Sequence, residues 1–182
     1  MKRYKVYPEE TQFYFTTSTI INWTPVFQKD EYFQIIIDSL KYCQEHKGLS
    51  IHGFVIMPTH IHLITSNTSK PSLQEIMRDF KHFTSTKIIE CLEKENHVPY
   101  LKVFQQAAVS RSNNQNYKVW KDEYHPIALK SAKWFLEKLA YIHTNPVRKG
   151  FVEKPENWKY SSARNWLSDD DSIIEIQKID AY

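Results

Sequence analysis

The stretch FVIMPTHIHLITSN, residues 54–67, decides the fold and raises the first question about function. Only Pro58 and Thr59 separate its two apolar halves, which predicts a β-hairpin with strands over 49–57 and 60–66. Successive side chains of a strand point to opposite faces, so His60 and His62 share one face of the sheet. A strand that could have been plain core therefore carries two imidazoles side by side.

The segments around this hairpin alternate between strand and helix patterns. Residues 12–20 are rich in β-branched and aromatic residues, which predicts a strand, and residues 117–120 are a candidate for a fourth. Apolar residues at helical spacing predict helices over 30–48, 71–95 and 128–145.

Local signals mark the ends of these helices. Gly48 stops the first, a capping box of Ser72 and Glu75 opens the second, and Pro146 is expected to end the third. The polar residues 105–118 are predicted to form a loop.

The resulting β-α-β-β-α-β-α order predicts an α+β fold, with one mainly antiparallel sheet and helices packed on one face. The chain shows no internal repeat and no clear linker. We therefore expect a single domain over 1–182, with a C-terminal extension from about residue 150.

The composition excludes several classes of protein. With 182 residues and a hydrophobic fraction of 41%, the chain can bury a core. Three glycines, without a GxGxxG or GxxxxGK[ST] pattern, argue against phosphate-cradling loops and against a cupin-type metal oxygenase. The two cysteines form no CxxC spacing, and no apolar span is long enough to cross a membrane, which favours a cytoplasmic protein. The net charge of +3 is compatible with binding nucleic acid.

Two histidines on one strand face allow two interpretations. They are half-exposed residues of a sheet surface, or they converge on one metal ion. Without a neighbouring cysteine or acidic cluster, a structural zinc site is disfavoured. An open two-histidine site would leave positions for phosphate oxygens, with Mg²⁺ or Mn²⁺ as the Lewis acid.

Three segments taken together resemble a known family: MPTHIHLI (57–64), VWKDEY (119–124) and YIHTNPVRKGFVEKPENWKYSSARNW (141–166). They resemble the REP-associated tyrosine transposases, which belong to the HUH single-tyrosine superfamily, and the resemblance runs from about Phe13 to Trp166. It implies a ferredoxin-like sheet and a divalent metal on His60 and His62. It also implies a tyrosine that attacks single-stranded DNA, leaving a 5′-phosphotyrosine and a free 3′-OH. On the family pattern this nucleophile is Tyr124.

The chain departs from the family pattern after Tyr124. Relatives usually offer a polar or acidic side chain about one helical turn later, as a third metal ligand, and this chain has Ala128 there. His125 is the nearest substitute, although it also reads as a turn residue before a proline. Tyr141 is a competing nucleophile, but its place in an apolar helix stripe favours a core role. Two functions remain open: a metal-dependent DNA strand transferase, and a catalytically impaired protein that binds hairpin DNA.

Basic side chains are the candidates for contacts with the DNA backbone. Charge alone favours an ordinary solvated helix face for the basic residues in 71–95, whereas the resemblance favours a DNA contact for Lys81. Single-stranded or hairpin DNA is the implied partner, and the sequence leaves open whether the protein is a monomer or a homodimer. The predicted DNA-binding residues are Arg78, Lys81, His82, Lys87, Arg148, Lys149 and Arg164.

Overall fold

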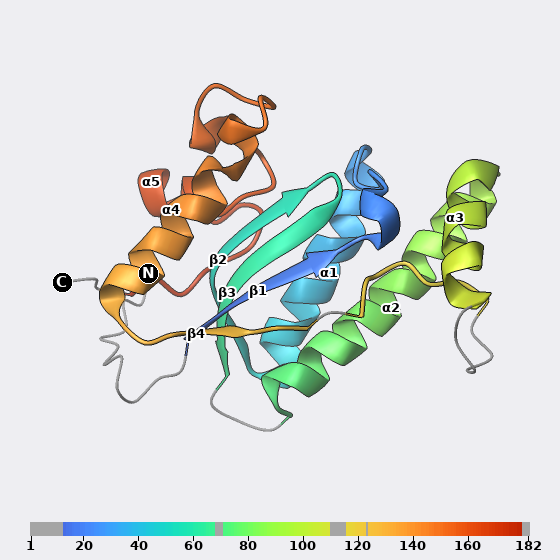
Figure 1. The fold of residues 1–182 in the computed structure, drawn as a ribbon. Coiled ribbons are helices and arrows are strands. Elements are labelled where there is room, and N and C mark those ends of the chain that lie inside the picture. The colour runs from blue at the N-terminus through green and yellow to red at the C-terminus, as the bar shows by residue number, and fades with distance from the viewer. Residues whose placement is uncertain (1–12, 68–70, 110–115, 123, 180–182) are drawn as a thin grey trace.

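The computed structural model describes residues 13–67, 71–109, 116–122 and 124–179. Its centre is a four-stranded antiparallel sheet (Figure 1). This confirms the predicted α+β class and the ferredoxin-like sheet. The strands lie in the order β2 (Leu49–Met57), β3 (His60–Asn67), β1 (Phe13–Thr19) and β4 (Ile127–Leu129).

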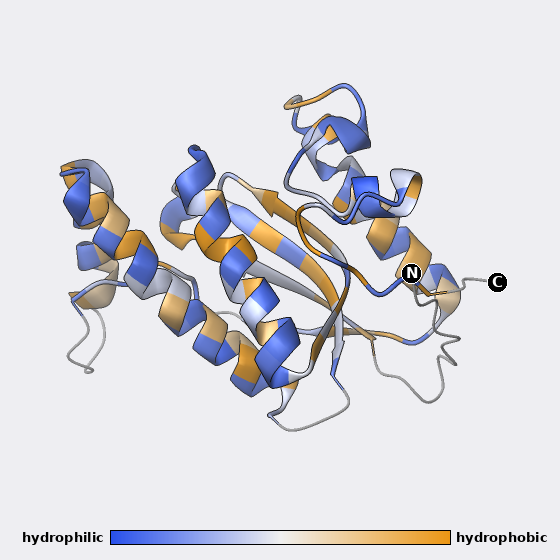
Figure 2. Ribbon diagram, turned by 180° about the vertical axis from the view of Figure 1, so that it is seen from behind, coloured by the Kyte–Doolittle hydropathy of each residue, from blue (hydrophilic) through white to orange (hydrophobic). Residues whose placement is uncertain are grey.

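Helices cover both faces of this sheet, whereas the sequence predicted helices on one face. Two long helices, α1 (Asp30–Lys47) and α2 (Leu73–Lys94), pack on one side, and α4 (Ala132–Arg148) packs on the other (Figure 1). Hydrophobic and hydrophilic residues alternate along the helices (Figure 2). The second layer forms because the central strands are apolar on both faces.

Strand β2 shows this double burial directly. Phe54 and Ile56 belong to the core beneath α1 and α2. Val55 and Met57, which point the other way, belong to a second core with Leu139 of α4. Gly53 allows α4 to approach, because a Cβ there would lie 2.8 Å from Leu139 Cδ1.

The predicted hairpin, the helix stop at Gly48 and the capping box at Ser72 are confirmed. Met57 pairs with His60 across the Pro58–Thr59 turn. Helix α1 ends at Gly48, whose φ of 68° is left-handed, and the capping box at Ser72 opens α2.

The end of α4 differs from the prediction. The helix continues through Pro146 to Arg148, so the proline does not end it. It ends where Gly150 adopts a φ of 73° and donates its amide to the carbonyl of Val147. The amide of Phe151 returns to the carbonyl of Pro146, which completes a glycine-based helix stop.

Two predicted elements were placed wrongly. Residues 117–120 form no strand, and Trp120 makes only an isolated bridge to Ile20. The fourth strand is β4, whose residues 127–129 pair with β1. It overlaps the beginning of the range 128–145, which was predicted to be helix throughout. Helix α3 (Val98–Val109) occupies the beginning of the predicted loop, and residues 110–115 lie outside the described part.

The remaining elements are short. They are η1 (Ile21–Trp23), η2 (Pro155–Asn157) and α5 (Ala163–Ser168). Within the described ranges, no helix has the length and apolar character needed to cross a membrane.

Candidate functional site

Strand β3 places His60 and His62 on the sheet face that α4 covers. Their ring centroids are 4.7 Å apart, and the His62 ring stacks on Phe15 of β1 at 5.3 Å. The parity argument from the sequence therefore holds. The expectation of a solvent-open pair does not, since only 7% of His60 and 5% of His62 are exposed.

A threonine hydroxyl orients each of the two rings. Thr17 Oγ1 lies 2.8 Å from His62 Nδ1, and Thr59 Oγ1 lies 2.9 Å from His60 Nδ1. When the hydroxyl accepts the Nδ1 proton, the lone pair of Nε2 is left for a ligand. His62 Nε2 is buried and has no hydrogen-bond partner among the described residues.

Both imidazoles are held in the neutral form that binds metal ions. Burial lowers the pKa of His62 to about 3, with smaller contributions from His60, Lys138 and Arg148. Burial also lowers the pKa of His60 to about 4, assisted by the charge of Lys149. The pair is therefore uncharged at neutral pH and surrounded by cations.

Helix α4 brings Tyr141 to this pair. The Tyr141 ring lies 5.3 Å from the His62 ring, centroid to centroid, and is partly exposed. The Arg148 guanidinium lies 4.3 Å from the centre of the Tyr141 ring, and Lys138 Nζ lies 5.6 Å from it. Tyr141 is therefore not the core residue that the sequence had suggested, but a partly exposed side chain beside His62.

Asn145 lies one helical turn after Tyr141, and sequence reasoning missed it. Its side chain is buried, and no described residue offers a hydrogen-bond partner to its Oδ1. The available signal was the spacing: the family pattern of a tyrosine followed by a polar residue one turn later fits Tyr141 and Asn145. Lys138, about one turn before Tyr141, was also missed by sequence reasoning.

Tyr124 lies on the opposite side of the sheet. It packs against the core beneath α1 and α2, and its hydroxyl is buried without a hydrogen-bond partner in the described ranges. Burial raises the pKa of Tyr124 to about 12, with a smaller contribution from Tyr14. A phenol in this position is harder to ionise and does not share a face with the histidine pair.

The predicted third ligand, His125, is exposed in the segment before β4. Among the described residues, no three His, Cys, Asp or Glu side chains gather closely enough to hold a metal ion, so His125 does not join His60 and His62. Ala128 pairs with Tyr14 inside the sheet. The chain runs from Tyr124 into β4 before α4 begins, so the position four residues after Tyr124 lies in a strand and not one helical turn away.

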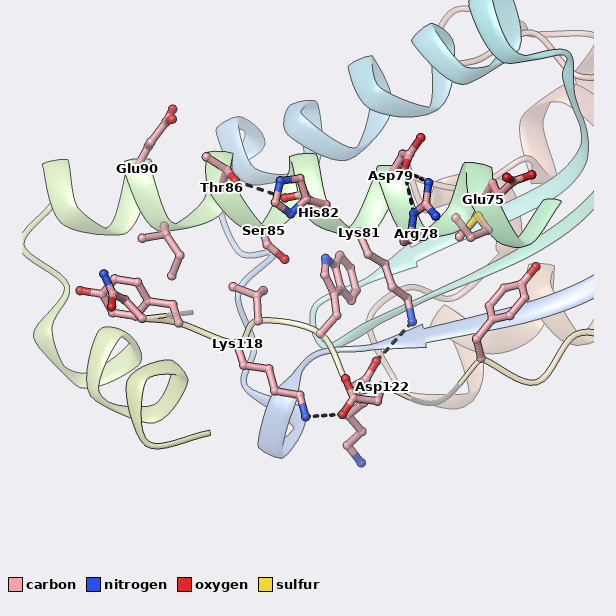
Figure 3. A pocket seen from close by; sticks show the side chains of 18 of the residues that line it. Glu75, Arg78, Asp79, Lys81, His82, Ser85, Thr86, Glu90, Lys118 and Asp122 are labelled. Carbon is pink, nitrogen blue, oxygen red and sulfur yellow. Dashed lines mark hydrogen bonds and ion pairs between the residues drawn. The ribbon is translucent and has the colours of Figure 1, made fainter. Parts of the chain in front are cut away.

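Most of the predicted DNA-binding residues of α2 line a groove of about 990 Å³ between α2 and residues 116–122 with Tyr124 (Figure 3). Arg78 donates to Asp79 at 3.0 Å, and Lys81 donates to the carbonyl of Lys121 at 3.3 Å. Acidic side chains, including Glu75 and Glu90, line the same groove. The groove is therefore mixed in charge and not a basic track.

The remaining predicted DNA-binding residues are scattered over the structure. His82 lines the groove, and Lys87 pairs with Glu90 at 2.7 Å. Arg164 donates to the carbonyl of Glu156 at 2.8 Å. Arg148 and Lys149 alone among the predicted set reach the histidine pair, as their effect on its pKa values shows.

Comparisons with known proteins bear on the family and the fold. Residues 19–106 match the family described as "Transposase IS200 like". A REP-associated tyrosine transposase of Haemophilus influenzae is 25% identical over 152 residues, which cover 82% of this chain and 78% of the relative. The fold matches the solved structure of a REP-associated tyrosine transposase bound to a REP hairpin, with a TM-score of 0.59 and 18% identity over 96% of this chain and 98% of that one. The resemblance drawn from the sequence motifs is confirmed.

Proposed function

We propose that this chain is an IS200-like transposase that cleaves and rejoins single-stranded or hairpin DNA through a 5′-phosphotyrosine. The family match over residues 19–106 supports this proposal. We propose Tyr141 as the nucleophile in place of Tyr124. One observation carries this choice: the Tyr141 ring lies 5.3 Å from His62, whereas Tyr124 packs on the far side of the sheet.

The charge around Tyr141 suits a DNA substrate. Lys138, Arg148 and Lys149 all lie close enough to lower the pKa of one of the two histidines. Cations gathered at one site attract a phosphodiester and hold it there. The matching solved relative is bound to a REP hairpin, which supports hairpin DNA as the substrate class.

The histidine face also fits a divalent ion. We propose that His60 and His62, through Nε2, and Asn145, through Oδ1, would hold Mg²⁺ or Mn²⁺. The fit rests on two buried atoms without partners among the described residues, His62 Nε2 and Asn145 Oδ1. When bound, such an ion supplies Lewis-acid polarisation of a phosphate oxygen. Asn145 takes the role that the sequence assigned to His125.

The residues of the chain then perform the strand transfer. Tyr141 Oη loses its proton and forms a bond to phosphorus, while the bond from phosphorus to the 3′ oxygen of the neighbouring nucleotide breaks. That oxygen takes up a proton and leaves as a free 3′-OH. Lys138 and Arg148 flank the ring and bind the phosphate under attack. The reverse reaction with another 3′-OH rejoins the strand without a further energy source.

With Tyr141 as the nucleophile, Ala128 is no longer an argument for a catalytically impaired protein. It lies in β4 and pairs with Tyr14, so its methyl group does not stand where a metal ligand is expected. A binding-only protein is the outcome if the wild type binds hairpin DNA and forms no adduct.

The test compares Tyr141→Phe with Tyr124→Phe, each of which removes one oxygen and little packing. The proteins are incubated with Mn²⁺ and hairpin oligonucleotides from the DNA beside the gene, and covalent adducts are resolved on a denaturing gel. We expect no adduct with Tyr141→Phe and the wild-type amount with Tyr124→Phe. The opposite result would restore Tyr124 as the nucleophile.

A further inference from the structure

Trp23 is a tryptophan that the fold holds out of the core beside His60. Its side chain is 55% exposed, and its ring lies 5.6 Å from the His60 ring, edge to face. Asn22 and Trp23 have φ angles of 53° and 54°, in the left-handed region that residues other than glycine rarely adopt. Two consecutive left-handed residues are a local strain that the rest of the structure must maintain.

The backbone just before Trp23 is anchored to two other segments. The amide of Ile20 donates to the carbonyl of Thr59, and the amide of Ile21 donates to the carbonyl of Val119, at 2.9 and 2.8 Å. Ile20 itself is fully buried. The turn is thus built into the hairpin that carries the histidines, yet it leaves the indole in solvent. Burial of the ring does not explain the strain.

A cation accompanies the exposed ring. Lys121 Nζ lies 5.0 Å from the centre of the Trp23 ring. The Lys121 amide donates to the carbonyl of Thr19 at 2.9 Å, which fixes the lysine beside the turn. An exposed aromatic face with an adjacent cation is the arrangement by which proteins bind single-stranded nucleic acid.

We propose that Trp23 is a stacking platform for a base of single-stranded DNA next to the scissile phosphate, and that Lys121 binds the backbone phosphate of that nucleotide. The position follows from the contact with His60, one of the two proposed metal ligands. A paired base inside a duplex has no free face to offer, so the platform selects an unpaired flank of the hairpin. The proposal rests on the proposed function for the presence of DNA, but stacking does not require cleavage.

The experiment uses hairpin oligonucleotides from the DNA beside the gene, with 2-aminopurine placed in turn at each position of the single-stranded flank. Stacking on tryptophan quenches this base, so quenching on binding should peak next to the cleavage position. Trp23→Asn removes the ring and keeps a residue that tolerates a positive φ, so it should fold as well as the wild type. We expect the quenching to disappear and the affinity to fall roughly tenfold. Trp23→Phe should keep most of both.

Tyr42→Asn is the matched control. Tyr42 is 53% exposed and stacks on His46 at 4.4 Å, but it lies on α1, on the other side of the sheet. It should change neither quenching nor affinity. The proposal is overturned if bound wild type quenches no position, or if Trp23→Asn quenches as the wild type does. Adduct formation tests the proposed strand transfer separately. Quenching by Trp23 without any covalent adduct would contradict strand transfer but would still support Trp23 as a stacking platform.

Discussion

Tyr141 and Tyr124 lie on opposite sides of one sheet, in surroundings that differ in both access and charge. Tyr141 is partly exposed and flanked by Lys138 and Arg148. Tyr124 has a buried hydroxyl beside a groove in which Arg78 donates to the neighbouring Asp79. Each tyrosine lies within a segment that resembles the family: Tyr124 ends residues 119–124, and Tyr141 begins residues 141–166. Only one of them meets the histidine pair, so the face of the sheet decides the chemistry.

The two sides also differ in their buried histidines. The buried histidines of the described residues, His52, His60, His62 and His143, all lie in or against the α4 side of the sheet. The side covered by α1 and α2 is built from apolar residues such as Leu40 and Phe80. The α4 side should therefore respond to metal ions and to the protonation of buried histidines.

The largest expected effect is on metal binding. Replacing both His60 and His62 with Ala removes two proposed ligands, and Mn²⁺ affinity should fall by more than the roughly 10–100-fold that loss of an outer-shell partner causes. His125→Ala should bind Mn²⁺ as the wild type does. Titration calorimetry measures both. A loss of affinity in His125→Ala alone would put the site on the Tyr124 side.

Acid should destabilise the fold through the α4 side. Burial lowers the pKa of His52 to about 4, against 6.5 for an ordinary histidine, and a hydrogen bond with the carbonyl of Gln177 opposes this shift. Between these pH values the unfolded chain binds more protons, so the free energy of unfolding falls as the pH drops from 6.5 to 4. The slope is up to about 1.4 kcal/mol per pH unit for this histidine.

Urea unfolding at a series of pH values measures this slope. His52→Gln should make it shallower by the share of one histidine. An unaltered slope in His52→Gln would show that His52 is not buried in the neutral form.

Asn145→Leu separates a metal ligand from a structural amide. Loss of Oδ1 should weaken Mn²⁺ binding on the order of tenfold, because it removes one contact about as strong as a hydrogen bond. Because that oxygen has no partner among the described residues, the free energy of unfolding without metal should hold or rise. Calorimetry and urea unfolding give the two readouts. A destabilised protein with unchanged Mn²⁺ affinity would contradict the assignment.

The smallest effect is on the salt dependence of DNA binding. Arg148→Ala should lower the slope of log affinity against log salt by about one unit, because one phosphate contact is lost. Arg78→Ala should change it less, because Arg78 is already bonded to Asp79. Fluorescence anisotropy with the hairpin oligonucleotide at several salt concentrations measures both slopes. A larger change in Arg78→Ala would move the DNA to the α2 groove.

The sequence by itself determined the local features of this protein. The hairpin, the shared face of His60 and His62, the capping box at Ser72 and the stop at Gly48 all follow from interactions within a few residues. The family resemblance follows from motifs that can be read without a structure. These features are reliable because side-chain alternation and helix capping depend only on the neighbouring backbone.

The tertiary structure decided which tyrosine faces the histidines. That choice depends on the pairing of Phe13 with Leu129, more than a hundred residues apart, which carries the chain past Tyr124 on one side and returns α4 on the other. The periodicity of α4 shows that Tyr141 lies in a stripe, but not which surface the stripe meets. A stripe on a helix follows from the local sequence. The surface that the stripe packs against depends on how both faces of β2 and β3 are buried, and only the folded chain shows this.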